Sequence, residues 1–126
     1  MRPSPEELRS MSLFAELGPA ELEQVASWFD VEERDSGATL TQQGSSGYAF
    51  YVLRDGTATV IQGDEEIRRL GPGDFFGELS IIGDGRRTAT VKATSHVTVW
   101  NMFGTEFRNL EQHFPELAKK IRTAYA

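Results

Sequence analysis

Two kinds of side chain that bind polar ligands lie close together in FGELSIIGDGRRTATV, residues 76–91. A single carboxylate, Glu78, follows a glycine near the start, and two guanidinium groups, Arg86 and Arg87, stand near the end. An arginine suits a phosphate because its planar fork donates two parallel, charge-assisted hydrogen bonds. A carboxylate repels phosphate but accepts hydrogen bonds well from ribose hydroxyls. The segment therefore predicts a site for a ligand of nucleotide size.

The apolar residues between these charges are expected to form one helical turn. Free backbone N–H groups at the start of a helix attract anions. The amides of Leu79 and Ser80 would then complete a cradle around the phosphate. The alternative is an internal salt bridge between Glu78 and Arg87 in a purely structural turn. The residues alone leave these two interpretations open.

Catalytic and metal-binding patterns find no support elsewhere in the chain. There is no cysteine, which excludes thiolate catalysis and cysteine-based metal sites. The histidines, His96 and His113, have no partner at metal-ligand or triad spacing and are expected to be structural or exposed. The stretch GPGDFFG lacks the lysine and hydroxyl of a P-loop and is interpreted as a tight turn. We expect neither an enzyme nor a bound metal or cofactor.

The charge of the chain limits its partners. The formal net charge is −6, which argues against nucleic-acid binding, because such proteins need a basic face. An anionic ligand must then be captured by local geometry against the overall field. The N-terminal RPSPEELRS is polar and lacks the apolar region of a signal peptide, and no apolar run approaches the roughly 20 residues that span a bilayer. We expect a cytoplasmic chain with no membrane segment.

Helices are expected at both ends of the chain. Ser4 is a good helix cap, and Gly18-Pro19 begins a second helix whose apolar positions recur at helical spacing. Near the C-terminus, Thr105 is expected to cap a helix, and Pro115 to end it and begin another. The apolar face of the second helix, expected to pack in the core, is Leu22, Val25, Ala26 and Phe29.

Between the helices, short segments rich in β-branched and aromatic residues alternate with glycine turns. Asp55-Gly56, between YVLR and TATV, is a strong hairpin signal. Many short strands without long intervening helices predict an antiparallel roll or jelly roll. The expected strands are 30–34, 38–42, 48–53, 57–62, 65–70, 74–76, 88–93 and 96–102.

Residues 76–91 closely resemble the phosphate-binding cassette of cyclic nucleotide-binding domains. The family pattern F-G-E-[LM]-[AS]-L-L, a variable loop, then R-[TAS]-A-[TSW]-V, is long and specific, and the resemblance extends over roughly residues 13–125. It implies a single domain, 1–126, with N-terminal helices in 1–29, an eight-stranded antiparallel β-roll in 30–103 and two C-terminal helices in 104–126. The matching positions are Phe76, Gly77, Glu78, Leu79, Ser80, Arg87, Thr88, Ala89, Thr90 and Val91.

The resemblance implies roles for several residues of the cassette. Arg87 would bind the cyclic phosphate and Glu78 the ribose 2′-hydroxyl, with the amides of Leu79 and Ser80 completing the cradle. Gly77 would let the backbone approach the ligand, which is cAMP or cGMP. In this family a hydroxyl at the position of Thr88 often assists a guanine base. Ala89 belongs to the site as part of the motif, whereas Arg86 matches no role and is expected at the surface.

The final helix closes over the base in this family, and three residues are candidates for the lid: Ile121, Arg122 and Tyr125. The resemblance thus implies a regulatory module that repositions its C-terminal helices on ligand binding and acts on an effector domain or partner protein. The alternative is a ligand-independent interaction module of the same fold.

Overall fold

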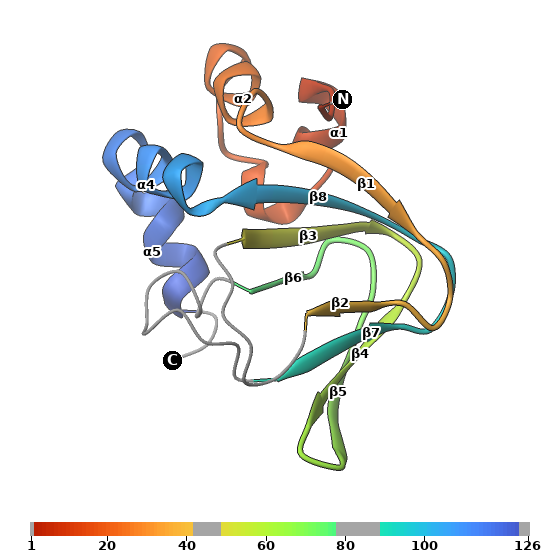
Figure 1. Ribbon diagram of the computed structural model, residues 1–126. Helices are drawn as coiled ribbons and strands as arrows, with labels where there is room; N and C mark the ends of the chain where they lie inside the picture. Colours follow the sequence, from red (N-terminus) through yellow and green to blue (C-terminus); the bar gives the residue numbers. More distant parts are fainter. Residues whose placement is uncertain (1, 42–48, 78–88, 124–126) are drawn as a thin grey trace.

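The computed structural model describes residues 2–41, 49–77 and 89–123, and in them a β-roll lies against helices from both ends of the chain (Figure 1). The helical elements are α1 (Pro5–Arg9), the 3-10 turn η1 (Ser12–Phe14), α2 (Pro19–Ala26), α4 (Gly104–His113) and α5 (Pro115–Thr123). The strands are β1 (Asp30–Arg34), β2 (Thr39–Thr41), β3 (Ala49–Asp55), β4 (Ala58–Gln62), β5 (Glu65–Leu70), β6 (Phe75–Phe76), β7 (Thr90–Ala93) and β8 (Val97–Phe103). The predicted fold class is confirmed, and the strand ends fall within two residues of those expected.

The strands form two antiparallel sheets. The first has the order β1-β8-β3-β6, and the second has the order β2-β7-β4-β5. The buried apolar side chains form two clusters, one between the sheets and one under the helices. Residues of β8 contribute to both: Val97 and Val99 belong to the cluster between the sheets, whereas Trp100 and Met102 belong to the cluster under the helices. The first sheet is therefore buried on both faces, which explains the nearly continuous apolar run of β8.

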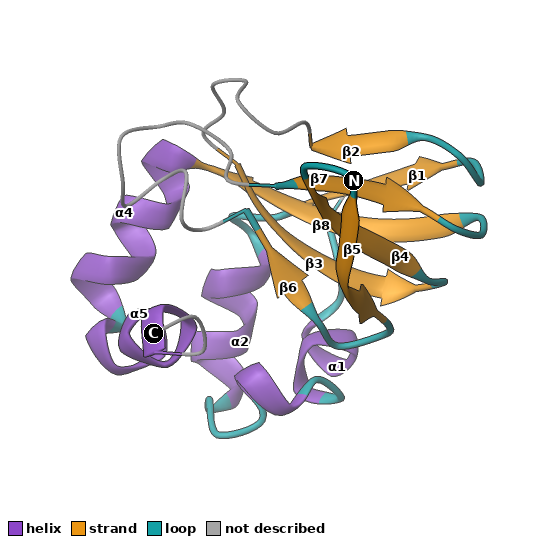
Figure 2. Cartoon of the chain, turned by 90° about the horizontal axis from the view of Figure 1, so that it is seen from below, coloured by secondary structure: helices purple, strands orange, loops and turns teal. Residues whose placement is uncertain are grey.

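The described helices all cover the same sheet. Figure 2 shows the described helices gathered on one side of the strands. Phe29 follows α2 and is buried at the centre of this layer, where its ring contacts Phe14, Phe50 and Trp100 with centroid distances of 5.9, 6.3 and 6.1 Å. The apolar face predicted for the second helix is buried, so that prediction is confirmed.

The hairpin prediction at Asp55-Gly56 is wrong. β3 lies in the first sheet and β4 in the second, so the chain crosses between sheets at this point. The glycine signal has a different cause: Gly56 has a φ of +90°, and a Cβ there would lie 2.3 Å from the His96 carbonyl oxygen. The turn is a corner of the roll, packed against the corner between β7 and β8.

These two corners are joined by hydrogen bonds. The Thr57 amide donates to the Ser95 hydroxyl at 3.0 Å, the Thr94 amide donates to the Thr57 carbonyl at 3.0 Å, and the hydroxyls of Thr57 and Thr94 are 2.7 Å apart. The corner between β1 and β2 joins them, because the Gly37 amide donates to the Ala93 carbonyl at 2.8 Å. These three crossings between the sheets therefore adjoin one another at one end of the roll.

The cap predicted for the first helix is confirmed, and the cap predicted for α4 is wrong. Ser4 and Glu7 form a reciprocal capping box, and Arg54 of β3 pairs with Glu7. The pKa of the Glu7 carboxyl is lowered, mainly because it accepts the Ser4 backbone N–H and also because Arg54 lies beside it. By contrast, α4 begins at Gly104 without a side-chain cap, and the Thr105 hydroxyl donates to Glu106 at 2.6 Å.

Candidate functional site

The cassette connects the two sheets of the roll. Its first residue belongs to β6, which pairs with β3 in the first sheet, and its last two belong to β7, which pairs with β2 and β4 in the second. Phe76 lies opposite Tyr51, and Thr90 lies opposite Ile61. Both attachment points are therefore away from the corner end of the roll, where Asp55 and Ala58 lie.

Gly77 marks the point where the chain leaves the first sheet. Its φ is +89°, a region that residues with a side chain rarely adopt. Phe76, just before it, is 4% exposed and stacks on Tyr51 with centroids 5.0 Å apart. The positive φ therefore explains why a glycine stands at this position. The residue before it is held in place by aromatic packing.

The chain enters the second sheet through Ala89. This residue is half-buried and packs against the cluster between the sheets, next to the buried Val91 of β7. Its carbonyl accepts a hydrogen bond of 3.5 Å from the hydroxyl of Thr41 in β2. Of the predicted site residues, the structure thus places Gly77 and Ala89 at the two ends of the cassette, one on each sheet.

The residues expected to contact the ligand fall in the intervening segment. Residues 78–88 lie outside the described residues, so their roles stay predictions. These are the ribose acid, the phosphate arginine, the cradle amides and the supporting hydroxyl, together with the neighbouring arginine: Glu78, Arg87, Leu79, Ser80, Thr88 and Arg86.

The lid candidates are on or after α5. Ile121 has no exposed surface and belongs to the cluster under the helices, together with Leu117 and Ala118. In this conformation the Ile121 side chain points into the hydrophobic cluster between the helices and the first sheet. The side chain of Arg122 and all of Tyr125 lie outside the described residues, so the choice of lid residue stays a prediction.

The aromatic support at the start of the cassette was not predicted. Tyr51 was expected only as part of a strand, and its stacking partner lies 25 positions away by the register of β3 and β6. The aromatic residues in YVLR and DFFG were visible, but their pairing depends on strand order. The sequence therefore showed that aromatic residues are present in both segments, but it did not show that Tyr51 and Phe76 are in contact.

The described residues offer no other chemical centre. Among them, no group of three or more histidine or acidic side chains could hold a metal ion, and no helix is long and apolar enough to cross a bilayer. His96 is exposed, with Nε2 3.0 Å from Glu33 and Nδ1 3.4 Å from Asp35. These carboxylates raise its pKa, the hydrogen bond to Glu33 contributing most. The cluster joins two corners of the roll, far from the cassette.

Fold and cassette together define a class of protein: a two-sheet roll in which the segment that carries the motif links the sheets, and in which the described helices cover one of them. The chain belongs to the cyclic nucleotide-binding domain family, whose model matches residues 31–114. The family is a regulatory one and not a family of enzymes, as the sequence predicted.

Curated relatives come from kinases and channels. The chain is 34% identical over 105 residues to a cAMP-dependent protein kinase regulatory subunit of Colletotrichum orbiculare, covering 82% of this chain and 27% of the relative. It is 31% identical over 113 residues to a cyclic nucleotide-gated potassium channel of Rhizobium etli, covering 90% of this chain and 32% of the relative. The chain thus spans about a third of these relatives' length or less.

Solved structures share the fold. The regulatory domain of Toxoplasma gondii PKA, crystallised with cAMP, superposes with a TM-score of 0.84 at 26% identity over 97% of this chain and 49% of that one. The catabolite activator protein of Thermus thermophilus superposes with a TM-score of 0.82 at 26% identity over 89% of this chain and 55% of that one. The resemblance found in residues 76–91 is confirmed at the level of the family.

Proposed function

We propose that this domain is a sensor that binds cAMP or cGMP through residues 76–91. The observation that carries the proposal is the anchoring of the cassette: it leaves the first sheet at Gly77, with φ +89°, and enters the second at the half-buried Ala89. The polar residues of the cassette thus lie in the sequence between two anchored positions, one on each sheet. The family of the chain supports the same ligand class.

The cassette residues that would contact the ligand have distinct tasks in this proposal. Arg87 makes a paired hydrogen bond to the cyclic phosphate, which compensates the unfavourable net charge of −6. Glu78 accepts a hydrogen bond from the ribose 2′-hydroxyl. The amides of Leu79 and Ser80 donate to the phosphate, and the Thr88 hydroxyl favours a guanine base.

The ligand acts as a switch because the closed state offers an extra contact to the base. Binding then raises the population of the closed state, in which α4 and α5 are placed so that a lid residue covers the base. The size of this population shift is set by the difference between the ligand's affinities for the two states. An effector domain or partner protein in the cytoplasm reads the helix position. Kinase and channel relatives, in which such a domain is one part of a longer chain, support this arrangement.

Calorimetric titration with cAMP and with cGMP tests the proposal. A charge-assisted hydrogen bond contributes about 1.5–3 kcal/mol, so Arg87→Ala is expected to weaken binding by roughly 10- to 100-fold. Arg86→Ala is the matched control, because it removes the same charge one position earlier and is expected to be nearly silent. Thr88→Ala is expected to lower the affinity for cGMP more than that for cAMP.

Three results would contradict the proposal in different ways. No heat with either nucleotide at millimolar concentration would favour a ligand-independent interaction module. Equal losses for Arg86→Ala and Arg87→Ala would indicate a general charge effect instead of a phosphate contact. Unchanged binding in Glu78→Gln would remove the ribose assignment while leaving the phosphate site intact.

A further inference from the structure

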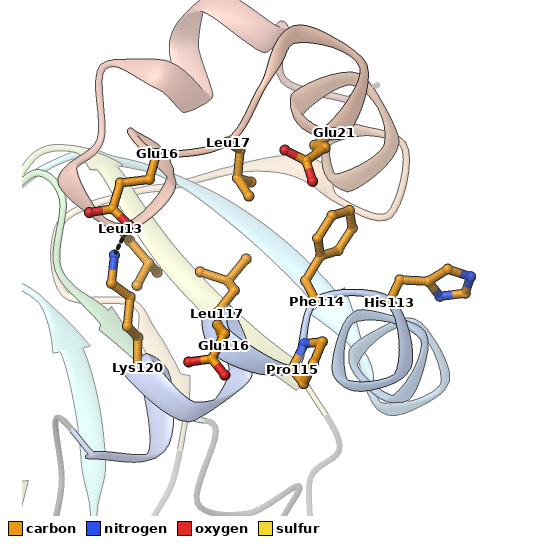
Figure 3. A pocket seen from close by; sticks show the side chains of 10 residues that line it. All are labelled: Leu13, Glu16, Leu17, Glu21, His113, Phe114, Pro115, Glu116, Leu117 and Lys120. Carbon is orange, nitrogen blue, oxygen red and sulfur yellow. Dashed lines mark ion pairs between the residues drawn. The ribbon is translucent and has the colours of Figure 1, made fainter.

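A groove of about 500 Å³ lies between the N-terminal helical segment and the junction of α4 with α5. Figure 3 shows its lining side chains, which come from η1, α2 and the stretch between them on one side and from the α4–α5 junction and α5 on the other. None of them belongs to the cassette or to a strand. The groove is therefore distinct from the proposed nucleotide site.

The floor of the groove is apolar. Leu13, Leu17 and Phe114 are half-buried and pack against the cluster under the helices, and Leu117 is 5% exposed. The Phe114 ring extends between α2 and α5 and meets Trp28 edge-on, with centroids 6.1 Å apart. Single exposed apolar residues are ordinary on a protein surface. Here several converge in one hollow of a size that can receive large apolar side chains.

The rim of the groove is acidic. Three carboxylates, from Glu16, Glu21 and Glu116, border it, against one ammonium group, that of Lys120. The Lys120 Nζ lies 3.6 Å from Glu16, whose side chain is 85% exposed, so this pair is long and well solvated. His113 points away from the floor, and its Nδ1 is 2.9 Å from the Asn109 carbonyl oxygen.

The three carboxylates differ in whether they form hydrogen bonds or ion pairs with other residues of the chain. Glu21 accepts the Gly18 N–H at 2.8 Å as part of a helix cap. Glu116 lies exposed in the first turn of α5 and forms no ion pair with any described residue. A second cation brought to this rim would therefore meet available negative charge, whereas an anion would be repelled.

We propose that this groove docks a basic amphipathic helix of a partner protein. An apolar side chain of the helix enters the hollow over Leu17 and Phe114, as in other helix-in-groove complexes. Lysine or arginine residues on either side of it lie near Glu16 and Glu116. The apolar contact supplies most of the affinity, and the charges supply orientation and discrimination against acidic segments.

The probe for this proposal is a fluorescein-labelled peptide with leucines at helical spacing and lysines on both flanks. Its matched partner has glutamates in place of the lysines. Fluorescence anisotropy is expected to show binding of the lysine peptide, weakening as NaCl is raised, and little binding of the glutamate peptide. No nucleotide is added, so the result does not depend on the proposed function.

Charge-reversal variants test the location. The double variant Glu16→Lys/Glu116→Lys is expected to bind the lysine peptide with an affinity lower by roughly tenfold or more. Glu65→Lys with Glu66→Lys, on β5, makes the same change in net charge away from the groove and is expected to have little effect. Leu17→Ala tests the floor. It is expected to lower the affinity for the lysine peptide while the protein still prefers that peptide to the glutamate peptide. Thermal unfolding confirms that each variant is folded.

Several outcomes would overturn the proposal. They are the absence of lysine-peptide binding, equal binding of both peptides, and an equal loss of affinity in the β5 control. Unchanged affinity in Leu17→Ala with folded protein would show that the peptide sits on acidic surface alone and not in the groove.

Discussion

The ring of Tyr51 stacks on the ring of Phe76 with 5.0 Å between centroids and 11° between planes, directly before the residue at which the cassette begins. The two residues are register partners in β3 and β6, so the stack fixes the short β6 against the first sheet. An aromatic pair contributes about 0.5–1.5 kcal/mol beyond the area it buries. Removing the stack should therefore affect both stability and the start of the cassette.

Tyr51→Ala is expected to lower the free energy of unfolding by about 1–3 kcal/mol, as measured by urea denaturation. Tyr51→Phe keeps the ring and is the matched control, with a smaller expected loss. If both variants lose the same amount, the phenolic hydroxyl and not the stack carries the stabilisation.

Two glycines with nearly the same backbone angle provide a test of the corner packing. Gly37 has a φ of +91° and open space around it, whereas Gly56 has a φ of +90° and lies against the His96 carbonyl. Gly37→Ala should cost about 1–2 kcal/mol, because only the left-handed conformation is penalised. Gly56→Ala should cost clearly more, because the new methyl group also collides with backbone. Similar denaturation midpoints for the two variants would rule out the close approach at Gly56.

His96 makes stability depend on pH. Its pKa is raised by hydrogen bonds to Glu33 first and Asp35 second, so the folded state binds the proton more tightly than the unfolded state. The stabilisation is therefore fully present below about pH 6.5, the ordinary histidine value, and is lost as the pH rises through the folded-state pKa. The melting temperature of the wild type should fall across this window more than that of His96→Gln. Parallel curves for the two proteins would count against the corner interaction.

Trp28 is positioned to report on the α4–α5 junction. Its ring lies 6.1 Å from Phe114 and 5.8 Å from His113, whereas Trp100 is completely buried in the first sheet. The Trp100 Nε1 has no hydrogen-bond partner among the described residues, so Trp100→Phe removes a donor that they leave unsatisfied, along with some packing, and a modest cost is expected. In that single-tryptophan variant, the emission of Trp28 should change when cyclic nucleotide binds.

The control for this experiment is Trp28→Phe, in which only the buried Trp100 remains and little change is expected. An emission change in the control, with none in Trp100→Phe, would mean that the ligand perturbs the roll and not the helix junction. That result would contradict the proposed switch while leaving the binding site itself untouched.

Local patterns predicted the elements well because their causes are local. The Ser4 capping box, Gly18-Pro19 and Pro115 each act on the backbone within one helical turn, and each begins a helix as expected. Thr105 failed as a cap because α4 starts one residue earlier, directly where β8 ends. The Asp55-Gly56 prediction failed because a glycine with positive φ serves a hairpin and a corner equally well.

The site could be recognised from the sequence because its polar residues are contiguous. A motif of 16 residues carries both the proposed ribose acid and the proposed phosphate arginine, so no tertiary information was needed to bring them together. The groove could not be predicted in this way. Leu17 and Phe114 line the same groove only because helices from opposite ends of the chain cover the same sheet, and neither segment contains a motif.

The pairing of the first strand with the last has a consequence for synthesis of the chain. Asp30 in β1 pairs with Asn101 in β8, so β1 leaves the ribosome long before its partner exists. At about 5–20 residues per second, that delay is roughly 4–14 s. The strand reads DVEER, and its acidic and basic side chains discourage association of an unpaired edge with other nascent chains. The charges of β1 would thus protect the polypeptide during its own translation.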